Sequence, residues 1–348
     1  MPAIDAWLVT GHALATEVML DAGAFTVDDP RFSTQQVIGP SMLSLDGSAH
    51  RRHRDPFVGS LRMSRVGGLE QFARSRADML MNRVVAKGSG DLRADVAGPL
   101  AVDLMARVLD LQDAEPAQVL SWYRDIVAGV DTVTRGGEVP ARARAAFRRL
   151  GEAVTRDRAT SELFAAVDRG GTLDDGEIVS NVAVLLFGGI VTSESSTAIA
   201  YLHLLSEPWL RRRLSDDVSL VADFVDESFL LEPAASVVDR YATGDITLGD
   251  AKIAKGDLVR VSLSAANRDP EVFPHPDRFD LTRANLRRSV TFARGPHACL
   301  GVHLARLEAR LAVEALLTTG RGLVLGHPMP VSGLVFRAPD SVPVHESR

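Results

Sequence analysis

The only cysteine of this chain, Cys299, stands in the stretch Phe292-Ala-Arg-Gly-Pro-His-Ala-Cys-Leu-Gly301. A cysteine that binds a metal must be deprotonated, and a helix N-terminus favours the thiolate through its dipole and free N–H groups. Pro296 disfavours helix before the cysteine, so we expect regular helix to resume at Cys299. Gly295 and Gly301 flank the sulfur where a flat ligand close to the backbone would favour glycine. A lone cysteine is more often a buried structural thiol, so it is the spacing around Cys299 that indicates a ligand.

The spacing resembles a family signature. Position for position, the stretch matches the haem-binding signature of the cytochrome P-450 superfamily, with Ala293 at a place where glycine is common. The matching residues are Phe292, Gly295, His297, Cys299 and Gly301. The resemblance implies the P-450 fold, a triangular, mainly α body with a small β region. It also implies haem b as the cofactor and Cys299 as its axial thiolate ligand.

Basic residues gather in a second segment, Ser48-Ala-His-Arg-Arg-His-Arg54. His50 and Arg54 are four residues apart and therefore share one face of a helix. Such a pair either holds a carboxylate or forms part of a solvated charged face. The resemblance implies the first role, because the family has a His-x-x-x-Arg pair here that holds a haem propionate. It implies the same role for Arg240 and His297.

The segment Leu185-Leu-Phe-Gly-Gly-Ile-Val-Thr-Ser-Glu194 lies inside a predicted long helix. Its glycine pair weakens a helix, which indicates either close approach of a flat ligand or tight helix packing. In the P-450 family an acid followed by Thr delivers protons here. Thr192 matches the alcohol, but Val191 stands where the acid belongs. Glu194 is three residues further on and either replaces the acid or faces elsewhere.

A second departure affects the family's Glu-x-x-Arg pair. Glu227 matches the Glu, but Leu230 stands where the Arg belongs. By resemblance Arg278 is the third partner of this ion network. A buried carboxylate that lacks one of two arginine partners is costly. We therefore expect weakened haem retention or stability rather than a different fold.

Composition limits the location and the partners. The chain has 348 residues, is 46% hydrophobic and 24% charged, and has a formal net charge of -6. That charge predicts no bulk attraction to nucleic acid or to an anionic membrane. A single cysteine excludes an intramolecular disulfide and suits a reducing cytoplasm. Met1–Thr10 lacks the features of a signal peptide, and the apolar run Val182–Val191 is too short to span a bilayer.

Local patterns predict one domain over residues 1–348. Helical patterns dominate from Ser48 to about Arg213, including a long helix from about Gly176 to Leu205 that is capped by Asp174 or Asp175. A further helix is expected over about Ser219–Leu231. Short strands are expected over Ala6–Thr10, Val237–Thr243, Ile246–Leu248 and Leu258–Ser262, and a closing pair over Gly322–Leu325 and Gly333–Arg337.

The resemblance implies a haem-thiolate monooxygenase or a related oxidase or peroxygenase. It would oxidise a small organic substrate, of the secondary-metabolite type, with O2 or peroxide. The missing acid favours an atypical mechanism, and the alternative is a non-catalytic auxiliary that activates a partner enzyme. The chain has no flavin or nicotinamide fingerprint, so electrons would come from a ferredoxin or flavodoxin. A basic patch of Arg51, Arg52, Arg287, Arg288 and Arg294 is predicted to dock it.

Overall fold

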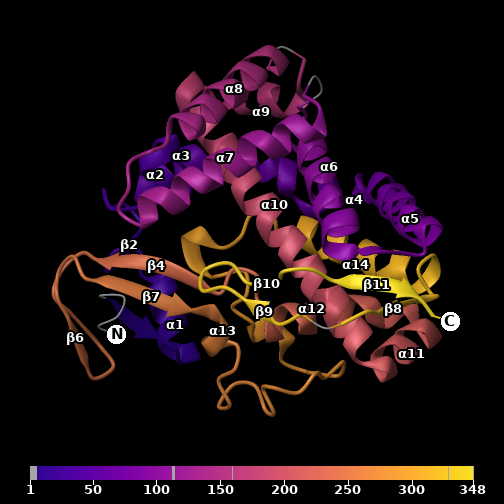
Figure 1. Ribbon diagram of the computed structural model, residues 1–348. Coiled ribbons are helices and arrows are strands. Elements are labelled where there is room, and N and C mark those ends of the chain that lie inside the picture. The colour runs from indigo at the N-terminus through magenta and orange to yellow at the C-terminus, as the bar shows by residue number, and fades with distance from the viewer. Residues whose placement is uncertain (1–5, 112–113, 159, 328, 348) are drawn as a thin grey trace.

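The computed structural model describes residues 6–111, 114–158, 160–327 and 329–347. The molecule is mainly helical and roughly triangular in outline, with small sheets along two sides (Figure 1). Helix α10 (Asp175–Ser206) crosses the middle of the triangle. This mainly α body with a small β region confirms the predicted fold class.

The other α-helices surround α10. They are α1 (His12–Leu20), α2 (Ser33–Ile38), α3 (Gly47–Val58), α4 (Met63–Gly67), α5 (Glu70–Lys87), α6 (Gly98–Val108), α7 (Pro116–Thr134), α8 (Ala141–Asp157), α9 (Glu162–Gly170), α11 (Pro208–Asp216), α12 (Val221–Leu231), α13 (Leu263–Ala266) and α14 (Val302–Thr318). A π-helical turn, η3 (Arg93–Ala97), leads into α6, and a 3-10 turn, η6 (Gly295–His297), precedes Cys299.

The strands form four small sheets. They are β1 (Trp7–Val9), β2 (Phe25–Thr26), β3 (Ser89–Asp91), β4 (Val237–Ala242), β5 (Ile246–Leu248), β6 (Ala251–Ile253), β7 (Leu258–Ser262), β8 (Leu323–Leu325), β9 (Val331–Ser332), β10 (Ala338–Pro339) and β11 (Pro343–Glu346). The main sheet has the order β1-β7-β4-β2, in which β1 runs parallel to β7 and the other pairs are antiparallel. Its register places Arg240 of β4 opposite Val259 of β7.

Helix α10 begins as predicted. The Asp174 side chain accepts a hydrogen bond from the backbone of Glu177, and the Glu177 side chain accepts one from the backbone of Asp174. This reciprocal capping box satisfies two of the free N–H groups at the helix start. By length and composition α10 could cross a membrane, but 61% of its most apolar window is buried inside the protein. Burial on most sides explains its apolar sequence as that of a central core helix.

Two predicted element boundaries are wrong. Regular helix begins at Val302 with Gly301 as its N-cap, so Cys299 lies in the turn before α14 and not at its first position. The closing pair is also different, because β8 pairs with β11 and the stretch 333–337 is mostly a turn. Gly333 takes a φ of +113°, which breaks an extended strand there. Strand β6 was not predicted.

Buried apolar residues form two clusters. The larger one is built from the helices and includes side chains from Val37 to Val344. The smaller one lies between the main sheet and α1, and includes Val18, Val259 and Val290. The cysteine stretch runs beside both clusters, since Phe292 packs on the first and Ala293 on the second. The prediction of one domain over residues 1–348 stays a prediction.

Candidate functional site

Cys299 lies between η6 and α14, in a turn held by its own backbone. The Cys299 N–H donates to the Phe292 carbonyl over 2.8 Å, and the Ala298 N–H donates to the Gly295 carbonyl over 3.1 Å. The Cys299 side chain is exposed at its surface, but protein surrounds it at longer range. Burial therefore raises the pKa of the Cys299 thiol, while the Gly301 N–H and the positive charge of Arg54 act in the opposite direction. A metal cation is the partner that would stabilise a thiolate here.

The glycines of this turn are needed for reasons that the sequence does not reveal. Gly295 has a φ of +74°, and a Cβ there would lie 2.4 Å from the Met19 carbonyl oxygen of α1. Close approach of α1, rather than of a flat ligand, thus suffices to require glycine. A Cβ on Gly301 would lie 4.0 Å from the Cys299 sulfur, which is ordinary contact. Ala293 has a φ of +54°, so the alanine occupies a left-handed conformation that favours glycine.

The four predicted carboxylate-binding residues come together from three elements. His50 and Arg54 lie on α3, Arg240 on β4 and His297 on η6. The His50 and His297 rings are 4.3 Å apart between centroids. An Arg54 guanidinium N–H donates to the carbonyl oxygen of Ala298 over 2.7 Å, which places this basic cluster beside the cysteine.

Two buried nitrogens of the basic cluster have no hydrogen-bond partner in the described residues. They are Nε2 of His50 and Nη2 of Arg240, on side chains that are 3% and 4% exposed. A buried polar group without a partner costs about 1–3 kcal/mol, and more when it is charged. Burial lowers the pKa of His50 to about 4, helped by the positive charges of His297 and Arg54, and burial also lowers the pKa of Arg240. The cluster therefore suits an anionic ligand that accepts hydrogen bonds.

Asp46 is the acidic residue that offsets part of this charge. Its carboxylate oxygen Oδ1 lies 2.8 Å from Nε2 of His297, and the other oxygen accepts from Thr26 and from the Val27 N–H. Burial raises the pKa of Asp46, but the hydrogen bonds from His297, Thr26 and Val27 outweigh it, and the pKa falls well below its usual range. The role of Asp46 was not predicted, because nothing local in the sequence links it to a residue 251 positions away.

Phe292 closes one side of the cysteine turn. Its ring packs edge-on against Phe229 of α12, with centroids 5.7 Å apart. The Arg306 guanidinium carbon lies 5.5 Å from the Phe292 ring centroid, at a distance that permits a cation–π contact. Helix α12 and helix α14 therefore both fix the start of the turn.

In α10 the glycine pair has two separate explanations. A Cβ on Gly189 would lie 2.2 Å from the Met105 sulfur, so this glycine serves packing against α6. A Cβ on Gly188 would meet nothing within 4 Å, so this glycine faces open space. The Thr192 hydroxyl donates to the Gly188 carbonyl oxygen one turn earlier. The opening along α10 thus lies beside Gly188 and Thr192.

Glu194 is engaged elsewhere. One of its carboxylate oxygens accepts from Nε of Arg93 over 2.8 Å, and Arg93 also donates to the Pro339 carbonyl over 2.6 Å. Gly98, at the start of α6, lies against the Glu194 carboxylate. Of the two alternatives drawn from the sequence, this contact favours a side chain that faces η3 and α6.

Comparison with known proteins agrees with the geometry. A family model described as "Cytochrome P450" matches residues 148–319. Cytochrome P450 107B1 of Saccharopolyspora erythraea is 32% identical over 344 residues, which cover 90% of this chain and 82% of that protein. The chain belongs to the cytochrome P450 family. Mycocyclosin synthase of Mycobacterium tuberculosis is 30% identical, with 98% of this chain and 89% of that protein covered.

A solved structure shows the same P450 fold. The structure of P450BioI, in complex with an acyl carrier protein that carries hexadec-9Z-enoic acid, has a TM-score of 0.89 and 26% identity, and covers 98% of this chain and 92% of that one. The chain is thus a monooxygenase of the P450 type, and its family implies a haem cofactor. The buried basic cluster beside Cys299 fits that group, because haem presents carboxylates as well as iron.

The ion network of this P450 differs from the prediction. Glu227 is fully buried and pairs with Arg283 through two contacts of 2.8 Å each, and it also accepts from the Asp280 N–H. Arg278 is exposed and offers Arg283 only its backbone carbonyl, over 2.7 Å. The Arg278 assignment was therefore wrong, because the path of the loop at 274–283 selects a different arginine. Arg283 thus takes the place predicted for Arg278, and Glu227 pairs with one arginine rather than two in the described residues, because the apolar Leu230 fills the core where the second arginine was expected.

A buried acid that the sequence analysis missed lies between the two central helices of this P450. Glu308 of α14 is fully buried, and neither carboxylate oxygen accepts a hydrogen bond of normal geometry within the described residues. Burial raises its pKa well above the ordinary value, and a weaker opposing effect comes from the hydroxyl of Ser193 in α10. The signal was present, since Glu308 falls in the apolar stripe of Leu304, Leu307 and Leu311.

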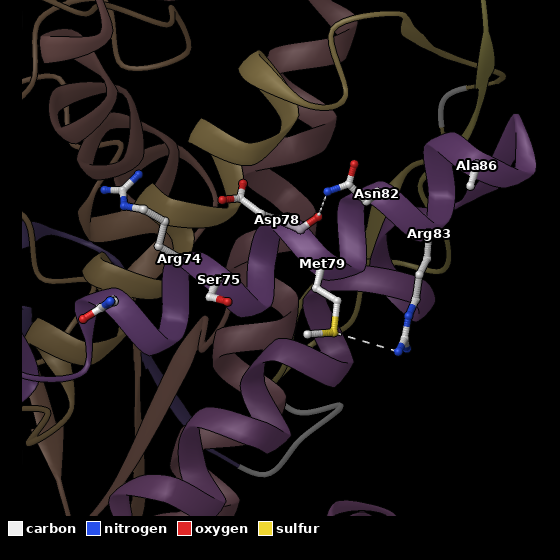
Figure 2. A pocket seen from close by; sticks show the side chains of 8 residues that line it. Arg74, Ser75, Asp78, Met79, Asn82, Arg83 and Ala86 are labelled. Carbon is white, nitrogen blue, oxygen red and sulfur yellow. Dashed lines mark hydrogen bonds between the residues drawn. The ribbon is translucent and has the colours of Figure 1, made fainter.

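Other surface features are separate from the cysteine. Arg294 donates to the backbone carbonyls at 287–289, and Arg52 pairs with Glu177. Arg52 therefore pairs with an acidic residue, whereas Arg294 bonds to backbone carbonyls and its Nε has no hydrogen-bond partner in the described residues. The docking patch stays a prediction. A surface hollow of about 750 Å³ lies along α5, where Met79 and Arg83 are in contact (Figure 2). No residue of the cysteine turn or the basic cluster lines it.

Proposed function

We propose that Cys299 is the axial thiolate ligand of haem b, and that this P450 oxidises a small organic substrate of the secondary-metabolite type. The observation that carries the proposal is that the unpartnered nitrogens of His50 and Arg240 belong to a cluster around His297, two residues before Cys299: the His50 ring packs on His297, and Arg240 interacts with Asp46, which contacts His297. A bound haem carboxylate would give these nitrogens the hydrogen-bond acceptor that the described part of the protein does not supply. Mycocyclosin synthase supports the substrate class by its name.

The residues divide the binding task. Cys299 would hold the iron, with Phe292, Gly295 and Gly301 shaping the turn around it. His50, Arg54, Arg240 and His297 would hold the propionates. When bound, a haem with a thiolate ligand supplies the redox chemistry that activates O2 or peroxide. The substrate would lie along α10, where Gly188 leaves open space.

Proton supply is the atypical part of the proposal. Thr192 can relay a proton, and its hydroxyl is anchored on the Gly188 carbonyl. Val191 carries no ionisable group, and the carboxylate of Glu194 is occupied by Arg93. Burial raises the pKa of Glu308 well above its ordinary value, which favours its protonated form, and the opposing contact comes from the hydroxyl of Ser193, which is next to Thr192 in α10. We therefore propose Glu308 as a second candidate for the missing acid beside Glu194, whose carboxylate is occupied by Arg93.

Partners and location follow the family. P450 enzymes act on small molecules and take electrons from a redox partner. For this chain we propose a ferredoxin or a flavodoxin, and a cytoplasmic location. The P450BioI complex supports a substrate that is either free or attached to an acyl carrier protein.

The test is the absorption spectrum of the purified protein, oxidised and then reduced with CO. We expect the thiolate-type Soret shift in the wild type and its loss in Cys299→Ala. The variant Ser289→Ala, in the loop that precedes the turn, should keep the shift. A histidine-type spectrum, an absence of haem, or an unchanged spectrum in Cys299→Ala would each contradict the proposal.

A further inference from the structure

Helix α8 carries an exposed face of arginines. Five arginines of this helix are exposed, namely Arg142, Arg144, Arg148, Arg149 and Arg156, and the one acidic residue on that face is Glu152. Five arginines against Glu152 and the buried Asp157 give α8 a charge of +3. Because the whole chain has a net charge of -6, the other residues together carry -9. Helix α8 thus carries a net positive charge and an arginine-rich exposed face in an otherwise acidic protein.

This charge opposes the stability of the helix itself. Arg142 lies in the first turn of α8, which has no acidic residue, so its charge faces the positive end of the helix dipole. Arg144 and Arg148 are four residues apart, a spacing at which like charges repel. Within the described residues Arg142, Arg148 and Arg149 make no ion pair. Residues that destabilise the helix in which they lie are typical of a functional surface.

The arginine face is held in a fixed place. The opposite side of α8 is apolar and buried, through residues that include Ala143, Ala146 and Leu150. Gly151 lies against Val179 near the start of α10. Figure 1 shows α8 at the apex of the triangle, beside α7 and away from α11. From Val179 to Gly188 is nine residues of helix, about 13 Å, so the buried side of α8 is separated from the proposed substrate opening by this length of α10, and the arginine face points away from it.

We propose that the exposed face of α8 is a docking surface for a compact acidic protein. Charge complementarity selects the sign of the partner and steers its approach. The net negative charge of the residues outside α8 limits the size of the partner. A long polyanion such as DNA, or an anionic membrane, would also face that remainder and be repelled. A compact acidic domain can touch α8 alone, and an acyl carrier protein is such a domain.

The test measures association of the haem-loaded P450 with a free acyl carrier protein, without substrate or turnover. The variant Arg142→Gln/Arg148→Gln/Arg149→Gln removes three charges from the α8 face. The control Arg212→Gln/Arg213→Gln/Arg321→Gln removes three exposed charges near α11. Binding does not depend on the thiolate, so failure here and failure of the haem assignment are distinguished by the CO spectrum of the same samples.

We expect the association rate at low salt to fall about tenfold or more in the α8 variant and to change little in the control. The wild-type rate should also fall steeply with ionic strength. An absence of binding at low salt, or equal losses in both variants, would overturn the proposal. So would a salt-sensitive self-association, or binding to a DNA duplex, that the α8 variant abolishes while carrier binding stays unchanged.

Discussion

The cysteine turn and the middle of α10 are held in contrasting ways. Around Cys299, residues from α1, α3, β4 and α14 meet, and two buried nitrogens without partners in the described residues, those of His50 and Arg240, belong to basic side chains suited to an anionic ligand. Along α10, Gly188 leaves space, Val191 has no ionisable group, and Glu194 pairs with Arg93. The first region has the charge and the unpartnered nitrogens that the proposed haem site requires. The second region does not show which residue supplies protons on the substrate side.

The largest expected effect tests the basic cluster. The variant His50→Ala/Arg54→Ala should weaken haem binding by about 3–6 kcal/mol, because each charged hydrogen bond to a carboxylate contributes about 1.5–3 kcal/mol. Haem occupancy after dialysis measures it. Arg51→Ala, an exposed arginine of the same helix, is the matched control and should keep its haem. Full occupancy in the double variant would remove these residues from the site.

The second-largest effect is expected for the buried ion pair between Glu227 and Arg283. Arg283→Leu leaves the fully buried Glu227 without its charged partner, and breaking a buried pair costs about 3–5 kcal/mol. Chemical denaturation gives the free energy of unfolding. Arg278→Leu should change it by no more than about 0.5 kcal/mol, as for an exposed surface residue. The reverse order of effects would restore Arg278 as the partner.

The third prediction concerns proton supply, which is tested by the coupling of the reaction, that is, the amount of product formed per electron consumed. Glu308→Gln should lower this coupling several-fold with O2, and it should affect peroxide-driven turnover less. Glu194→Gln should leave it nearly unchanged, since Arg93 already occupies that carboxylate. Val191→Glu should raise it by adding an acid within reach of Thr192. Coupling that falls in Glu194→Gln but not in Glu308→Gln would reverse our assignment.

A buried histidine between the two regions predicts a pH effect. Nδ1 of His53 accepts from the Asn181 amide of α10 over 2.9 Å, and burial lowers the pKa of His53 below 6.5. The unfolded chain then binds more protons than the folded one, so the stability is complete above pH 6.5 and is lost as the pH falls below it.

His53→Asn keeps an acceptor and cannot be protonated, so it tests this effect directly. The slope of unfolding free energy against pH below 6.5 should flatten in this variant. An unchanged slope would show that other groups dominate the acid response. His303→Asn, a histidine on α14, supplies the matched comparison.

The smallest effect concerns the strained alanine of the cysteine turn. Ala293→Gly should stabilise the protein by about 0.5–1 kcal/mol, because a left-handed alanine costs about 1–2 kcal/mol and the added chain entropy returns part of it. Thermal unfolding measures it. Ala298→Gly, at a φ of -56°, should instead destabilise. A lower unfolding temperature in Ala293→Gly would show that the methyl packing of Ala293 outweighs the strain.

Much of the cysteine region could be predicted from the sequence, because its residues are close together in the chain or follow a long motif. His50, Arg54, Arg240 and His297 do converge. What failed depends on long-range geometry. Arg283 replaced Arg278 because a loop without regular structure decides which side chain turns inward. Arg93 lies 101 residues from Glu194, and no local pattern links the two.

Backbone details were also out of reach. Gly295 is required because a carbonyl of α1 approaches it closely. Ala293 adopts its left-handed conformation within a turn whose shape the sequence does not specify. The closing strands were misplaced because short apolar runs near Gly333 fit several pairings. The buried acid Glu308, by contrast, could have been noticed, as a carboxylate within an apolar helical stripe.

The central claim is that Cys299 and the basic cluster belong to one haem site. X-ray absorption at the iron edge of the haem-loaded protein tests it most directly. We predict one sulfur atom at bonding distance from iron in the wild type and in Arg51→Ala, and its disappearance in Cys299→Ala. Iron surrounded only by nitrogen and oxygen in the wild type would contradict the account.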